Sequence, residues 1–124
     1  MNFFNLLYNY KRLKKSESKD KKLEKTKSKL IGKFCIVRTY SAGVFAGVLT
    51  SLDGKIGEVE NARRVWYWDG AASLSELSIK GANPQTSKIP EPVKLVHLTE
   101  IIEIIPCEQQ AIKFFKDCPV WKKQ

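Results

Sequence analysis

The chain has 124 residues and carries 22 Lys and Arg against 13 Asp and Glu, a net charge of +9. This length provides for one modest core and an appendage, and a hydrophobic content of 43% excludes disorder throughout the chain. No stretch reaches the roughly 18 apolar residues of a membrane-spanning helix. Three cysteines without a Cys-x-x-Cys pair indicate reduced thiols rather than a disulfide scaffold or a zinc site, so we expect a cytoplasmic protein.

The positive charge is concentrated at the N-terminus. Residues 1–33 hold 11 basic and 3 acidic residues (net +8), whereas the rest of the chain holds 11 basic and 10 acidic residues (net +1). We therefore divide the chain into a basic N-terminal segment, residues 1–32, and a β-rich binding module, residues 33–124. The composition of the first segment suits either a helix or a flexible linker, and residues 11–33 could contact nucleic acid.

The first half of the module has the pattern of short strands. Runs with the composition of β-strands occupy 33–40, 43–52, 55–61 and 63–68. The run 33–40 is apolar on both faces until Arg38, which indicates a central strand. Asp53-Gly54 predicts a tight hairpin between the second and third strands.

In the second half of the module, the spacing of apolar residues changes from that of a strand to that of a helix. Residues 71–81 fit a short helix, with Ser73 as N-cap, Glu76 three residues later and Gly81 just after the end. A proline-marked loop follows at 82–92, then strands at 93–98 and 100–105, and an amphipathic helix at 107–117. The fold expected is mainly β (α+β): a small curled antiparallel sheet or barrel with two short helices.

Groups suited to catalysis are scarce. The single histidine, His97, falls in a predicted strand, and no nucleophile elbow, P-loop, zincin or dinucleotide motif is present. Glu100 and Glu103 are three residues apart, which in a strand places them on opposite faces. We expect a protein that is not an enzyme and has no catalytic residue, metal or cofactor.

The richest cluster of binding groups is the run Asn61–Trp68. Two adjacent arginines supply forks that match phosphates, and three consecutive aromatic residues supply stacking surfaces. The Ser-rich segment that follows offers backbone N–H groups if it opens a helix. The same aromatic residues could equally be core, an alternative that stays open here. The candidate ligand-binding residues are Arg38, Tyr40, Arg63, Arg64, Trp66, Trp68, Ser73 and Ser75.

Three segments, VRTYSAGVFAGVL, NARRVWYWDGAASLSELSIKG and LTEIIEIIPC, carry a resemblance. Over about residues 34–122 the chain resembles a family of small phage- and prophage-encoded proteins classed as a domain of unknown function. The resemblance implies no established activity and no inherited catalytic residue. It implies a setting, that of small accessory proteins acting in the host bacterial cytoplasm, some of which sequester nucleotide immune signals.

Three functions follow as hypotheses. The first is a non-enzymatic protein that sequesters a small nucleotide, such as an ADP-ribose-type or cyclic nucleotide immune signal, in a pocket completed by a homo-oligomer. The second is a nucleic-acid-binding accessory protein that uses the basic N-terminal segment and the aromatic strand. The third is an inhibitor that binds a host enzyme through the Trp-rich strand.

Overall fold

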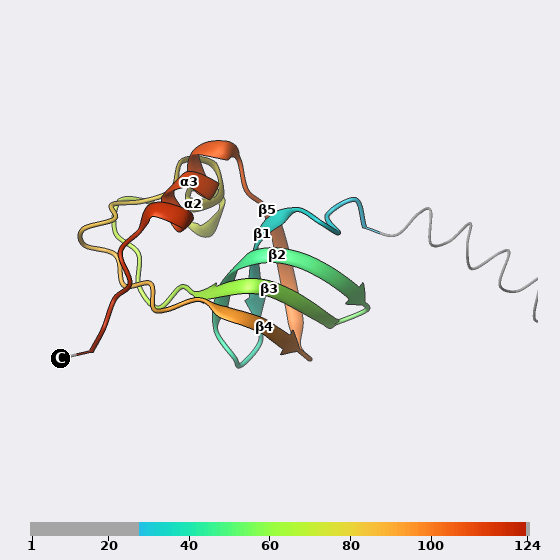
Figure 1. Ribbon diagram of the computed structural model, residues 1–124. Coiled ribbons are helices and arrows are strands. Elements are labelled where there is room, and N and C mark those ends of the chain that lie inside the picture. The colour runs from blue at the N-terminus through green and yellow to red at the C-terminus, as the bar shows by residue number, and fades with distance from the viewer. Residues whose placement is uncertain (1–27, 124) are drawn as a thin grey trace, which may run out of the picture.

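The computed structural model describes residues 28–123, so the basic segment predicted at residues 1–32 lies almost entirely outside them. The described part consists of five strands and two helices (Figure 1). These are β1 Phe34–Thr39, β2 Val44–Asp53, β3 Ile56–Arg64, α2 Leu74–Lys80, β4 Val93–Leu98, β5 Ile101–Pro106 and α3 Gln109–Asp117. No helix among residues 28–123 is long and apolar enough to cross a membrane.

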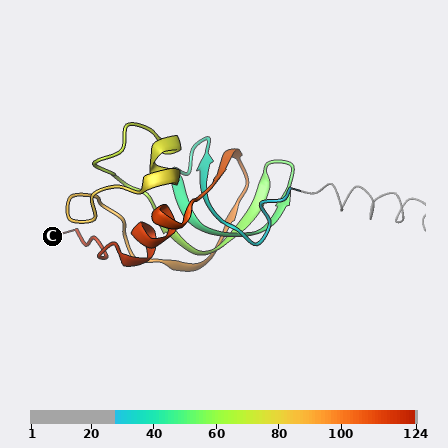
Figure 2. The same ribbon diagram turned by 90° about the horizontal axis from the view of Figure 1, so that it is seen from above.

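All five strands form one antiparallel sheet in the order β4-β3-β2-β1-β5. β4 and β5 follow one another in the chain with only Thr99 and Glu100 between them, yet they occupy the two opposite edges of the sheet. The sheet therefore curls strongly, without closing, and α2 and α3 pack together at one end of it (Figures 1 and 2). The predicted class, a small curled antiparallel sheet with two short helices, is confirmed.

β1 lies at the centre of the packing because both of its faces are buried. Cys35 and Val37 belong to a cluster within the curl, whereas Ile36 between them belongs to a second cluster beneath the helices. The first cluster also contains Phe45, Leu49, Val59, Ala62, Leu98 and Ile101. The second also contains Ala46, Val65, Leu77, Ile89, Phe114, Phe115 and Cys118. The absence of alternation in 34–37, which predicted a central strand, reflects these two cores.

The prediction of separate strands at 55–61 and 63–68 is wrong. β3 is one strand that continues to Arg64, and its register against β2 shifts between Ala46 and Val48. Asn61 accommodates this bulge with a positive φ of 50°, a conformation that Asn tolerates better than most residues. Across the bulge, a Cβ on Gly47 would lie 2.6 Å from the Glu60 carbonyl oxygen, so the close approach of the two strands requires glycine.

The aromatic run leaves the sheet after Arg64. The N–H groups of Trp66 and Tyr67 both donate to the Lys88 carbonyl at 3.2 Å, and Lys88 N–H donates back to Tyr67. A short two-stranded contact with the 82–92 loop thus replaces the strand predicted through Trp68.

Local capping signals fix the short helix α2 as predicted. Ser73 is the N-cap and accepts the Glu76 N–H, while the Glu76 carboxylate accepts the Ala72 N–H. Gly81 ends the helix with φ 74° and donates to the Leu77 carbonyl. Phe114 of α3 packs against Gly81 so closely that a Cβ there would lie 2.5 Å from it.

Gly47→Ala should destabilise the fold, because the added methyl group overlaps the β3 backbone and neither strand can move without disturbing both cores. We expect a loss of about 1–3 kcal/mol in the free energy of unfolding, measured by urea denaturation. Gly54→Asn is the control, since Gly54 has open space around it and a positive φ that Asn tolerates. Equal stability of the two variants would contradict the close-approach role of Gly47.

The buried thiols give stability a dependence on alkaline pH. Burial raises the pKa of Cys35 to about 11 and that of Cys107 to about 12. Unfolded thiols ionise near pH 8.5. Stability from the neutral buried thiols is therefore full below the unfolded pKa and is lost as the pH rises toward the folded values. We expect the free energy of unfolding to fall above about pH 9 and to fall less steeply in Cys35→Ala. A steeper or unchanged fall in the variant would contradict this assignment.

Candidate functional site

Arg63 is the most heavily hydrogen-bonded side chain described, and it is only 7% exposed. Its Nη1 donates to the carbonyls of Phe115 (2.7 Å) and Cys118 (2.8 Å) at the end of α3. Nη2 donates to Ile89 at 2.7 Å and Pro119 at 3.4 Å, and Nε donates to Pro90 at 3.1 Å. The guanidinium thus uses all five of its N–H groups on backbone carbonyls.

No carboxylate is among these partners. Burial lowers the pKa of Arg63 from its usual range, but a guanidinium stays charged in proteins. Carbonyl dipoles at the C-terminal end of α3 carry partial negative charge, which stabilises the cation. Arg63 therefore joins α3, the C-terminal tail and the 89–90 segment to the sheet. Its positive charge lies beneath them and is not neutralised by a carboxylate.

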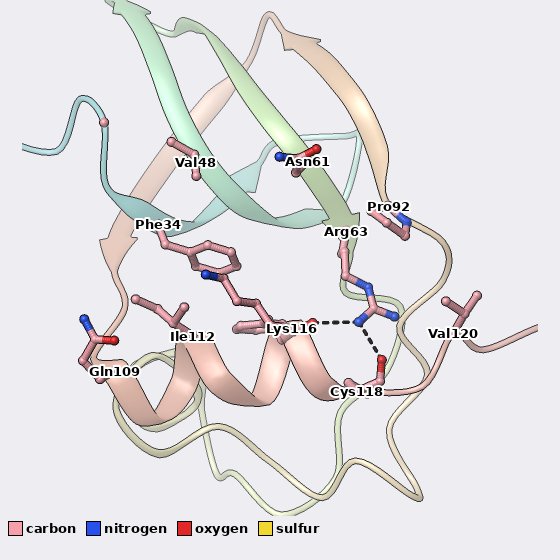
Figure 3. Close-up of a pocket in the computed structure, with 12 residues that line it drawn as sticks. Phe34, Val48, Asn61, Arg63, Pro92, Gln109, Ile112, Lys116, Cys118 and Val120 are labelled. Atoms are coloured by element: carbon pink, nitrogen blue, oxygen red, sulfur yellow. Dashed lines mark hydrogen bonds between the residues drawn. The ribbon is translucent and has the colours of Figure 1, made fainter.

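A cleft of about 630 Å³ lies next to this charge, between α3 and the face of β1, β2 and β3 that looks toward the helices (Figure 3). Its apolar walls include Phe34, Val48 and Ile112, and Phe34 stacks on Phe115 with ring centroids 5.8 Å apart. The full lining is Gly32, Phe34, Val48, Asn61, Arg63, Pro92, Gln109, Ile112, Phe115, Lys116, Cys118 and Val120.

Polar groups enter the cleft from both sides. The Asn61 side chain comes from the β3 bulge, while Gln109 and Lys116 come from α3 two turns apart (Figure 3). The lining includes two cations, Arg63 and Lys116, and no Asp or Glu. The cleft therefore combines a positive potential, two amides and two aromatic rings, a set suited to an anionic ligand with a flat apolar part.

The other arginines of the predicted site lie elsewhere. Arg38 forms an exposed ion pair with Glu103 at 3.1 Å. Arg64 donates to the Ala42 carbonyl and lies over the Phe45 ring, 4.4 Å from its centroid. Neither lines the cleft, so Arg63 and Arg64 diverge although they are adjacent in sequence.

The predicted aromatic and serine residues also lie outside the cleft. Tyr40 and Trp66 are exposed, whereas Trp68 is half-buried and donates its Nε1–H to the Ala71 carbonyl at 3.2 Å. Ser73 is occupied as the α2 N-cap, and Ser75 accepts the Ser78 hydroxyl through its carbonyl. Of the eight predicted site residues, only Arg63 lines the cleft.

Sequence reasoning missed Gln109, Ile112 and Lys116 as members of the site, and it included Asn61 only as the first residue of the run Asn61–Trp68. Gln109, Ile112 and Lys116 recur at helical spacing on α3, so a signal for a shared face was present. The face of the sheet opposite α3 could not be predicted, because its shape depends on the bulge at Asn61. Within the part of the chain that the structure describes, no three His, Cys, Asp or Glu side chains are grouped to hold a metal ion.

A family model covers most of the sheet and the helices. A family model described as "Domain of unknown function (DUF6948)" matches residues 32–115, more than half of the chain. No curated protein and no solved structure matches the chain. The matched region runs from Gly32, two residues before β1, into α3, and it includes most of the cleft lining but not Lys116, Cys118 and Val120.

Arg63→Met should be among the most destabilising single changes, because it leaves buried carbonyls without donors in three segments. We expect a loss of about 3 kcal/mol or more in the free energy of unfolding. Arg64→Met is the matched control, since its exposed guanidinium makes one hydrogen bond and one ring contact, and it should lose about 1 kcal/mol or less. Similar losses in both variants, read from chemical denaturation, would show that Arg63 is not the tie described here.

Proposed function

We propose that this chain, which belongs to the DUF6948 family, is a non-enzymatic protein that binds a small nucleotide in the cleft between α3 and the sheet. The observation that carries the proposal is the composition of the cleft lining, which has two cations, two amides and two phenyl rings but no carboxylate. A cleft of about 630 Å³ has the size of small-molecule sites, which fall roughly between 300 and 1,000 Å³.

The groups of a nucleotide find counterparts along the cleft. A base would lie against Phe34 and Ile112, where Asn61 and Gln109 offer amide donors and acceptors to its edge. Phosphates would lie toward Lys116, an exposed residue that lines the cleft. Arg63 would act through its charge alone, because its N–H groups are already used.

The cleft lining supports binding of a ligand without its chemical conversion. The cleft contains amides, cations and apolar groups, and its one thiol, Cys118, is buried, with a pKa that burial raises. A thiol in that state is a poor nucleophile. The proposal in its finer form is sequestration of an ADP-ribose-type or cyclic nucleotide immune signal by a phage-encoded protein, a setting supported by the sequence resemblance alone.

A second candidate rests on exposed aromatic residues outside the cleft. Trp66 is 64% exposed, and the Lys88 ammonium lies 5.6 Å from the ring centroids of both Tyr67 and Trp121. Such a surface, together with the Lys-rich N-terminal segment, suits stacking and phosphate contacts with single-stranded nucleic acid. It would also suit a protein partner, and the salt dependence of binding separates the two, since phosphate contacts release counterions.

A nucleotide panel tests the main proposal. The full chain would be titrated with mono-, di- and cyclic nucleotides and ADP-ribose, using thermal shift and calorimetry, and each bound ligand would be recovered after denaturation. We expect at least one ligand to raise the melting temperature and to be recovered intact. A panel without any binding would contradict the proposal, and a ligand recovered as product would contradict its non-enzymatic form.

Charge reversal on α3 locates the site. Lys116→Glu should weaken binding about tenfold or more, because it replaces an attraction to phosphate by a repulsion. Lys113→Glu is the matched control, since Lys113 lies on the same helix outside this cleft and changes net charge equally. Equal weakening by both would indicate a general charge effect rather than binding in the cleft.

A further inference from the structure

β4 is an edge strand that exposes apolar side chains. Its backbone pairs with β3 on one side, and the register runs from Leu98 to Val93 without the shifts that interrupt other pairs of strands. Val93 is 53% exposed and Leu95 is 49% exposed. An edge with free backbone groups and exposed apolar side chains is a template for another strand.

The opposite edge, β5, carries the features that block such pairing. Its register against β1 shifts at Arg38 and Thr39, Glu103 is held in an ion pair with Arg38, and Pro106 ends the strand. Bulges, charges and prolines are the usual means by which proteins protect an edge. β4 carries one charge, Lys94, but neither a bulge nor a proline within its bounds, so its backbone is better suited to pairing than that of β5.

We infer that β4 is the contact surface for a second copy of this chain, through antiparallel β4–β4 pairing about a two-fold axis. The sequence of β4 allows this pairing when the axis passes at Leu95. Leu95 then faces Leu95 of the second copy, Val93 faces His97, and Lys94 faces Val96. No like charges are directly opposed in this register. A shift of the axis to Lys94 would bring two lysines together, which disfavours it.

A two-fold pair is also the form that closes on itself. Pairing of β4 with β5 of another copy would be head-to-tail and would require a ring or a filament. A β4–β4 pair instead extends the sheet continuously across two copies and uses up the exposed edge of each. Pro92, which lines one end of the cleft, immediately precedes β4, so the second copy would lie beside that end of each cleft. The inference does not depend on the proposed function.

The first test measures the oligomeric state of the full chain by sedimentation and light scattering over a range of concentrations. Wild type should form a dimer, and Leu95→Lys should shift it to monomer by opposing two ammonium groups at the axis. Ile102→Lys is the matched control on the β5 edge, where Ile102 is 47% exposed, and it should remain dimeric. A monomeric wild type, a larger ring, or loss of assembly in both variants would overturn the inference.

The second test fixes the register by cross-linking under mild oxidation. Residues directly opposite in an antiparallel pair have Cα atoms about 4.5–5.5 Å apart, within reach of a disulfide. Leu95→Cys should therefore form a disulfide-linked dimer. In Val93→Cys the two cysteines would be offset by four residues, about 13 Å, and should not link. Cys35 and Cys118 are buried, and wild type serves as the background for Cys107. Linking of Val93→Cys but not of Leu95→Cys would overturn the register.

Discussion

The buried guanidinium of Arg63 connects β3 to segments that lie far from it along the chain. Its five hydrogen bonds reach carbonyls of Ile89, Pro90, Phe115, Cys118 and Pro119. The helices pack on the sheet over an apolar cluster that lies on the other side of β1 from the cluster within the curl, and Arg63 adds a polar tie to this apolar packing. A cation suits the position, because the last carbonyls of α3 have no partners within the helix.

This structural role also shapes the cleft. Fixing the end of α3 against β3 holds Lys116 and Gln109 opposite the bulge at Asn61, and the distance between helix and sheet leaves space that side chains do not fill (Figure 3). The same guanidinium contributes a positive charge that no neighbouring carboxylate cancels. One residue thus stabilises the arrangement and gives the cleft its electrostatic character, although it has no N–H group left for a ligand.

The parts of the fold that depend on local sequence could be predicted, and those that depend on contacts between distant segments could not. Asp53-Gly54 and the Ser73–Glu76 capping box are local signals, and the hairpin and α2 occur where they indicate. The course of β3 was missed because the bulge at Asn61 requires Gly47 on another strand. The sequence favoured a phosphate partner for Arg63. The carbonyls that Arg63 contacts instead lie 26 to 56 residues away along the chain, so the sequence could not identify them as its partners. Of the candidate site, the sequence therefore indicated the charge but not the pocket that contains it.

The central claim, that an anionic ligand binds between α3 and the sheet, is tested most directly by a nuclear magnetic resonance titration of ¹⁵N-labelled full chain with the panel nucleotides. The side-chain amides of Asn61 and Gln109 report on the cleft, and the indoles of Trp66 and Trp68 report on the aromatic run outside it. The account predicts saturable shifts of both amides and of backbone signals around Lys116, with the Trp66 indole unchanged. Shifts confined to the indoles and to Arg64 would contradict it.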